Sequence, residues 1–294
     1  MILADDIVAM AGGPLDVGGF ASNVSRLLKD AQKFVYEPNT ASALARLAKS
    51  KPDTLLAALP LCRAPFPVVW LEWPGGLGDG EPRPDQIIPL KFGVLIRSLN
   101  EEGTKLGLLF GYGSGAKRTC LVPAAAEIDL LAPTAGCLSP LEAMAKKTTV
   151  GLSEMARDFM KIVRIRGGKT LEDAMIKSSM EDIQGELEYV IAALCLLSAK
   201  AGVNKEPADL AKINKRRKIN GKRELLSYST VKIAISLREE RAANAAGMTA
   251  AEMRQHIVRG HFKVRPSGVY WWRPFVRGKA SAGTVVRQGY SVSR

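Results

Sequence analysis

Apolar runs between residues 67 and 122 predict an antiparallel sheet. Residues 67–73 have the composition of a strand, and residues 91–99 and 104–112 form two partly β-branched apolar runs. Asn100-Glu101-Glu102-Gly103 separates these two runs, and glycine adopts the positive φ that tight turns need, so we expect a hairpin there. A fourth strand is expected at residues 118–122.

Helical patterns occupy the segments on either side of these strands. Helices are expected around residues 23–34, 40–49 and 53–59, the last of them ended by Pro60. Cap-like residues at Ser153, Thr170 and Ser178 predict three further helices, of which the last runs to about residue 200. This last helix carries apolar residues at helical spacing, which predict a face packed against the core: Ile183, Leu187, Val190, Ile191, Leu194 and Leu197.

The pattern changes after residue 204. Residues 214–223 hold six cations and a glycine, which predicts an exposed loop. A strand is expected within residues 226–237, and Thr249 with Glu252 predicts a helix that ends near Ile257. The fold class is therefore predicted as α+β: a small N-terminal antiparallel sheet with helices (1–150), a central helical segment (151–203) and a C-terminal basic β-hairpin module (204–294).

The hairpin of this last module is expected to join residues 261–265 and 269–273 through the turn Pro266-Ser267-Gly268. Because side chains alternate along a strand, His261, Lys263 and Arg265 should share one face. The return strand carries three aromatic residues in succession, Tyr270-Trp271-Trp272. The same alternation predicts that at least one of the two tryptophans covers the core.

Charge is distributed very unevenly along the 294 residues. Residues 204–294 hold 20 Lys or Arg against 6 Asp or Glu, a balance of +14, whereas residues 1–203 have a balance of −1. Such a segregated charge attracts polyanions. A basic surface that only serves solubility is the alternative, but it would spread the charge along the chain.

Cations and aromatic residues together indicate nucleic acid, either DNA or RNA, as the partner. Lys and Arg neutralise phosphates, and aromatic rings stack on exposed bases. The predicted binding residues are Lys215, Arg216, Arg217, Lys218, Lys222, Arg223, Arg259, His261, Lys263, Arg265, Trp271, Trp272, Arg273 and Arg277.

No residue pattern points to a metal site, and no cofactor is predicted. His256 and His261 are the only histidines, and the four cysteines show no C-x-x-C spacing, which predicts buried free thiols. His261 is a weak catalytic candidate, because cations beside it would stabilise the anion formed in phosphodiester cleavage. A structural histidine is the alternative. Glu72 is expected to be solvated or ion-paired at a strand edge.

No membrane association is expected, and the protein should act in the cytoplasm. The dense apolar stretch 190–197 is too short for a bilayer span. Acidic residues at positions 5 and 6 replace the positive charges of a secretory signal.

The C-terminal third carries a recognisable succession of motifs: Asn214-Lys215-Arg216-Arg217, Arg259-Gly260-His261, Gly268 and Trp271 or Trp272. With these motifs it resembles a family of uncharacterised proteins encoded by tailed bacteriophages and prophages. The resemblance implies a bacterial host cell and carries no catalytic role.

Three functions remain open from the sequence. The first is nucleic-acid binding without catalysis. The second is a metal-independent nuclease that uses His261, and the third is a host-takeover or anti-defence factor that binds a host protein through Trp271, Trp272 and Phe275.

Overall fold

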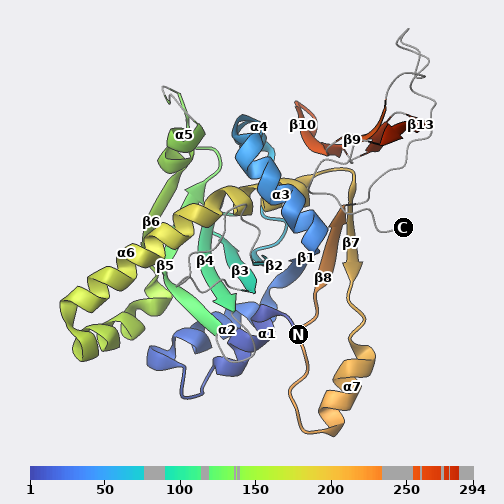
Figure 1. Cartoon of the computed structure of the whole chain (residues 1–294). Helices are drawn as coiled ribbons and strands as arrows, with labels where there is room; N and C mark the ends of the chain where they lie inside the picture. The colour runs from blue at the N-terminus through green and yellow to red at the C-terminus, as the bar shows by residue number, and fades with distance from the viewer. Residues whose placement is uncertain are drawn as a thin grey trace.

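An eight-stranded mixed sheet forms the centre of the molecule (Figure 1). The computed structural model describes residues 1–75, 90–113, 119–135, 137, 140–233, 254–258, 260–272, 275–277 and 279–284. In spatial order the strands are β6 (Thr148–Leu152), β5 (Thr119–Asp129), β4 (Lys105–Gly113), β3 (Lys91–Ser98), β2 (Val68–Pro74), β1 (Gln32–Tyr36), β8 (Ser229–Ile233) and β7 (Val203–Pro207). β1 runs parallel to β2 and β8, and the other neighbours are antiparallel.

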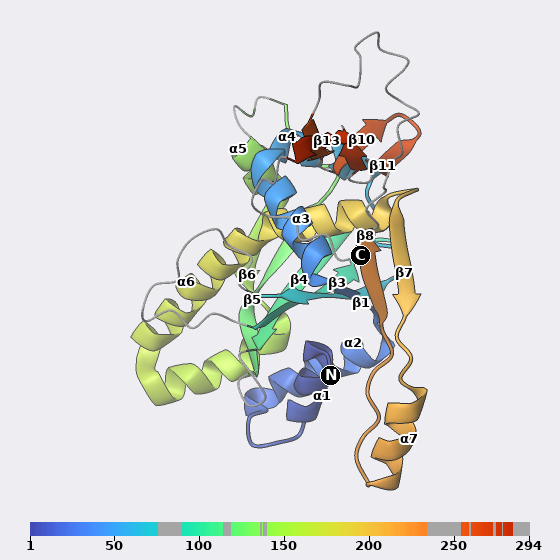
Figure 2. The ribbon, with the colours of Figure 1, turned by 45° about the vertical axis from the view of Figure 1, so that its right-hand side comes forward.

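Helices cover both faces of this sheet (Figure 2). α1 (Leu3–Met10) and α2 (Phe20–Asp30) pack on one face, in a core that includes Trp70 and Leu95. α3 (Pro38–Ser50), α4 (Pro52–Ala58) and the second half of α6 (Arg157–Ser198) pack on the other face, in a core that includes Leu71 and Ile96. Burial on both faces explains the nearly continuous apolar sequence of β2 and β3.

The prediction of three helices between residues 153 and 200 is confirmed for two of them and wrong for the third. The span Arg157–Ser198 consists of two helices that meet at Gly168, where φ of 76° and ψ of 176° are not helical, so Thr170 lies near the start of the second helix. Ser178 lies inside that second helix and begins no helix of its own, and the neighbouring Ser179 hydroxyl donates to the Met175 carbonyl at 2.6 Å. The predicted apolar stripe is confirmed, because all six of its residues are buried.

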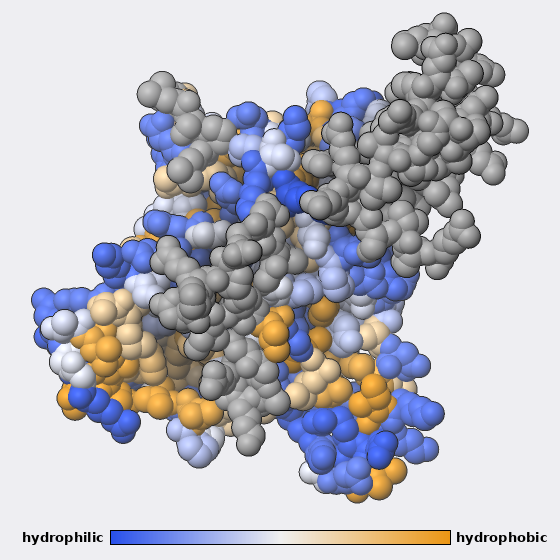
Figure 3. Space-filling view, in the orientation of Figure 1, coloured by the Kyte–Doolittle hydropathy of each residue, from blue (hydrophilic) through white to orange (hydrophobic). Residues whose placement is uncertain are grey.

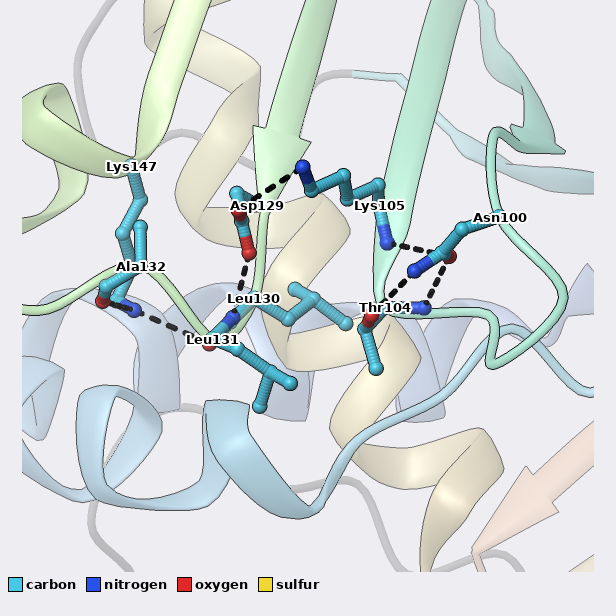
Figure 4. A network of polar contacts seen from close by, with 8 residues as sticks. All are labelled: Asn100, Thr104, Lys105, Asp129, Leu130, Leu131, Ala132 and Lys147. Carbon is cyan, nitrogen blue, oxygen red and sulfur yellow. Dashed lines mark hydrogen bonds and ion pairs between the residues drawn. The ribbon is translucent and has the colours of Figure 1, made fainter.

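The hairpin predicted between residues 91 and 112 is confirmed as β3 and β4. Gly103 has φ of 65°, and the side chain of Asn100 accepts hydrogen bonds from the backbone amides of Thr104 and Lys105, both at 2.9 Å (Figure 4). Beside this turn, the buried Lys147 at the end of α5 (Pro140–Lys147) donates to the carbonyls of Leu130 and Ala132. This corner of the sheet is therefore held by polar contacts.

The predicted N-terminal sheet is too small, and the prediction that it is purely antiparallel is wrong. β1 was missed because the expected helix over residues 23–34 ends at Asp30, and a strand of only five residues follows. The fold is mixed α/β. Its large sheet contains both parallel and antiparallel pairs and includes β7 and β8 from the basic third of the chain. Within the described residues, the sheet therefore continues across the predicted boundaries at residues 150 and 203.

Two further predictions in the basic third are wrong. The expected loop at residues 214–223 is largely helix, α7 (Ala211–Ile219). The expected helix from Thr249 to about Ile257 is wrong in its described part, which is β9 (Arg254–Val258), and residues 249–253 lie outside the described part of the chain. β9 pairs with β12 (Phe275–Arg277) and β13 (Lys279–Thr284). The strand expected within residues 226–237 corresponds to β8, and residues 234–237 lie outside the described part of the chain.

β10 (His261–Arg265) and β11 (Gly268–Trp272) pair in antiparallel fashion and lie against the main core. Phe262, Val269 and Trp271 are buried, and the rings of Phe262 and Trp271 meet edge to face at 4.9 Å. The backbone amide of Lys200, just after α6, donates to the carbonyl of Val269 at 3.1 Å. These contacts join β10 and β11 to the same hydrophobic core as the large sheet.

Candidate functional site

α7 stands away from the sheet at the end of an arm formed by residues 208–228 (Figures 1 and 2). This arm connects the edge strand β7 to its neighbour β8, and the ladder between them ends at the pair Pro207 and Ser229. One more backbone bond, from Ala208 to the carbonyl of Tyr228 at 2.9 Å, closes the base of the arm. No residue of α7 is buried.

Seven cations and no acid lie between residues 211 and 223. Lys212, Lys215, Arg216 and Lys218 on the helix are exposed, as is Lys222 after it. Within the described part of the chain, none of these five has an ion pair with a carboxylate. Figure 3 shows the arm as a mainly hydrophilic projection at the lower right, with hydrophobic spots in keeping with the exposed Ile213 and Ile219.

Hydrogen bonds hold α7 against the returning half of the arm. The side chain of Asn214 donates to the carbonyl of Leu225 at 3.1 Å and accepts from its amide at 2.8 Å. Nε of Arg217 donates to the carbonyl of Arg223 at 2.7 Å. The orientation of the helix is therefore fixed before any partner binds.

Asp5 in α1 anchors this arm to the body. The buried carboxylate of Asp5 accepts a hydrogen bond from the backbone amide of Leu226 at 2.8 Å. The backbone carbonyl of Asp5 accepts another from the guanidinium of Arg223, also at 2.8 Å. Arg223, a predicted phosphate ligand, thus makes a contact within the fold although the residue is exposed. Asp5 was missed because its partners are more than 200 positions away in the sequence.

The paired strands β10 and β11 present a second basic surface. His261, Lys263 and Arg265 lie on one face of β10, and the ring of Trp272, which is 46% exposed, shares that face. Nζ of Lys263 lies 4.3 Å from the centre of the Trp272 ring, and the ring centres of His261 and Trp272 are 5.5 Å apart. Lys263 therefore covers one face of the Trp272 ring, which still leaves the residue 46% exposed.

The remaining predicted residues divide into buried and undescribed ones. Trp271 is only 3% exposed and packs in the core, so its assignment to nucleic-acid stacking or to a host-protein contact is corrected. Arg259, Arg273 and the side chain of Arg277 lie outside the described residues.

The structure does not bring the two basic surfaces together. α7 lies at one end of the β7–β8 pair, and β10 and β11 lie toward the other end (Figure 1). Lys232, on β8 between the two surfaces, is already paired with carboxylates, because it forms ion pairs with Glu206 at 2.8 Å and Glu37 at 3.2 Å. The net charge of this third therefore overstates the number of cations free to meet a polyanion.

Of the two expectations for Glu72, ion pairing is confirmed, because Nζ of Lys91 lies 3.9 Å from Oε1, whereas solvation at a strand edge is wrong. Glu72 lies on the central strand β2, and its two carboxylate oxygens are 2.8 and 2.7 Å from the backbone amide of Leu3, while one of them also accepts from the indole nitrogen of Trp70 at 3.0 Å. Burial raises the pKa of Glu72, although these hydrogen bonds act in the opposite direction. Glu72 thus holds the start of α1 on the sheet.

A second unusual carboxyl group lies on α6, one turn after Asp182. Burial, followed by the negative charge of Asp182, raises the pKa of Glu186 to about 7. Tyr189, on the next turn, is buried against Trp73, with ring centres 4.5 Å apart. A carboxyl group that changes its charge near neutral pH is a common feature of functional sites, but it also affects stability directly.

Glu186→Gln should stabilise the chain above neutral pH. The folded state binds the Glu186 proton more tightly than the unfolded state, so the contribution of Glu186 to stability is greatest below pH 4.5 and is lost as the pH rises through 7. At pH 8 the variant should be about 2 to 3 kcal/mol more stable, with little difference near pH 4. Urea unfolding across this range measures the effect, with Glu188→Gln as a control for loss of charge. A constant offset between the two curves would contradict the raised pKa.

An open groove of about 330 Å³ lies elsewhere, where α2 leaves part of its sheet face uncovered. Its walls are mainly apolar, with Arg97, Glu127 and Glu154 as the charged residues. Among the described residues, no group of three or more His, Cys, Asp and Glu side chains could hold a metal ion.

Within the same residues, no helix is both long and apolar enough to span a membrane. Comparison with models of protein families, with curated proteins and with solved structures gives no match. The function has to be inferred from the residues of this chain and their arrangement.

Proposed function

We propose that this protein binds nucleic acid without cleaving it, mainly through the cations of α7. The observation that carries the proposal is a projecting helix, hydrogen-bonded to the returning segment of the arm, whose exposed cations have no carboxylate partner among the described residues. Cations without partners in the fold are free to neutralise phosphates, and the release of bound counterions then drives binding. The arm needs no rearrangement to do so.

β10 and β11 form a second contact in this proposal. Trp272 offers a ring that is 46% exposed for stacking, and His261, Lys263 and Arg265 on the same face add donors for phosphates. Because this surface lies away from α7, a short oligonucleotide should occupy one surface at a time. The resemblance to phage-encoded proteins adds the proposal that binding takes place in the cytoplasm of a bacterial host.

Removal of the helix cations should weaken binding and flatten its salt dependence. Each phosphate contact contributes about 0.7 to 0.9 to the slope of log K against log salt. The combined change Lys212→Ala, Lys215→Ala, Arg216→Ala and Lys218→Ala should therefore reduce the magnitude of the slope by about 3. Fluorescence anisotropy of the full-length protein across a salt series measures it.

Two control variants separate local contacts from general charge. Lys29→Ala, Lys51→Ala, Lys161→Ala and Lys169→Ala together remove the same charge from exposed positions on the nearly neutral part of the chain, and should leave the slope unchanged. Trp272→Ala removes a ring and no charge, so it should weaken single-strand binding by about 1 to 3 kcal/mol at constant slope. An unchanged slope in the α7 variant, with its circular dichroism intact, would refute the role of the helix.

The nuclease alternative is tested with the same material. His261 is exposed and lies on the basic face with Lys263 and Arg265. Cleavage of labelled RNA or DNA in the presence of EDTA, lost in His261→Ala, would replace binding by catalysis as the function. Capture of a host protein that survives nuclease treatment and high salt would instead favour the host-protein alternative.

A further inference from the structure

We infer that α7 enters the major groove of B-form duplex DNA, an inference that rests on the proposed function and specifies its substrate. The first observation is the position of the helix at the end of the arm formed by residues 208–228. Two chain segments carry it away from the sheet, and its contact with the body runs through Arg223 and Leu226 at the base. Within the part of the chain that the structure describes, the fold therefore leaves the helix free to enter a groove.

The second observation is the division of α7 into an inner and an outer side. Asn214 and Arg217 bond to the returning segment and define the inner side. Residues three, four and seven positions apart share one face of a helix, so Lys212, Lys215, Arg216 and Ile219 form the outer side. All four are exposed, and Ile219 is 75% exposed.

This outer side fits the chemistry of a major groove. The groove is about 12 Å wide and admits an α-helix, and phosphates line both of its edges. Cations on either side of the helix can meet both strands, while an apolar side chain between them can contact thymine methyl groups. Ile219, an otherwise unexplained exposed isoleucine among cations, suits that place.

Other nucleic acids fit this surface less well. The major groove of A-form RNA is too narrow and deep for a helix to read, and single-strand binding relies on aromatic stacking. α7 has no aromatic residue. Asn214, the one amide side chain within the helix, is already hydrogen-bonded to Leu225. Arg216 is the arginine among the exposed residues of the outer side, and a guanidinium can donate two hydrogen bonds to one guanine.

The test compares the affinity of the full-length protein for four probes of one sequence. These are a DNA duplex of about two helical turns, the same duplex with glucosylated 5-hydroxymethylcytosine filling its major groove, a duplex RNA and a single-stranded DNA. The plain DNA duplex should bind at least about tenfold more tightly than the duplex RNA, and glucosylation should remove most of that advantage.

Two variants that each remove one exposed cation complete the test. Arg216→Gln, on the outer side, should reduce the ratio of the affinity for duplex DNA to that for duplex RNA. Lys222→Gln, after the helix, should lower the affinity for both duplexes by the same factor. Equal binding of all four probes would overturn the major-groove inference and leave nucleic-acid binding intact. Failure to bind any probe at low salt would overturn the proposed function, and this inference with it.

Discussion

Oxidation of Cys62 and Cys195 to a disulfide should raise the free energy of unfolding by about 5 kcal/mol. Both side chains are fully buried, and their sulfur atoms lie 3.3 Å apart, so closing the bond needs a movement of about 1 Å. The hydroxyl of Ser198 bonds to the backbone of Arg63, which holds the two segments side by side. A cross-link over 133 positions removes much of the entropy of the unfolded chain.

The pair should be reduced in the native protein as isolated with a thiol. The hydrogen bond between Cys195 and Cys62, and then burial, raise the pKa of Cys195 well above its ordinary value. The Cys195 thiol therefore stays protonated, and a protonated thiol reacts slowly. Incubation with glutathione disulfide in mild denaturant should convert the two thiols to one disulfide and release two molecules of glutathione.

Mass spectrometry and urea unfolding check this result. The double variant Cys120→Ser and Cys137→Ser leaves only this pair able to react, and adding Cys195→Ser should abolish the cross-link and the gain in stability. A cross-linked protein no more stable than the reduced one would show that the disulfide strains the native packing.

Glu72→Ala should destabilise the fold by about 3 to 4 kcal/mol. The change leaves the backbone amide of Leu3 and the indole nitrogen of Trp70 without their acceptor, and both groups are buried. Gly93 makes room for this indole, because a Cβ at that position would lie 2.1 Å from the Trp70 ring. Trp70 therefore cannot move away to find another partner.

Thermal and urea unfolding measure the loss, with Glu101→Ala in the exposed β3–β4 turn as the control. Since Glu72 holds α1 and Asp5 of α1 holds the arm, the variant should also weaken duplex DNA binding, although Glu72 is buried in the sheet. A loss below about 1 kcal/mol would mean that the carboxylate contributes no more than an ordinary hydrogen bond.

Sequence alone located the elements whose signals are local. The β3–β4 hairpin depends on Gly103, and the buried stripe of α6 depends on helical spacing, so neighbouring residues suffice to predict both. The concentration of cations after residue 204 is also a property of composition. On that basis the segment 214–223 could be identified as exposed and basic, although its helical conformation was missed.

Only the tertiary structure decided what these elements do. β1 becomes a central strand through its pairing with β2 and β8, and which tryptophan is exposed depends on the face of β11 that meets the core. The side chain of Arg223 hydrogen-bonds to the body of the protein because Asp5 lies beside it. Each of these outcomes is set by contacts between residues far apart in the sequence, and a side chain's charge or size does not reveal which distant group it will meet.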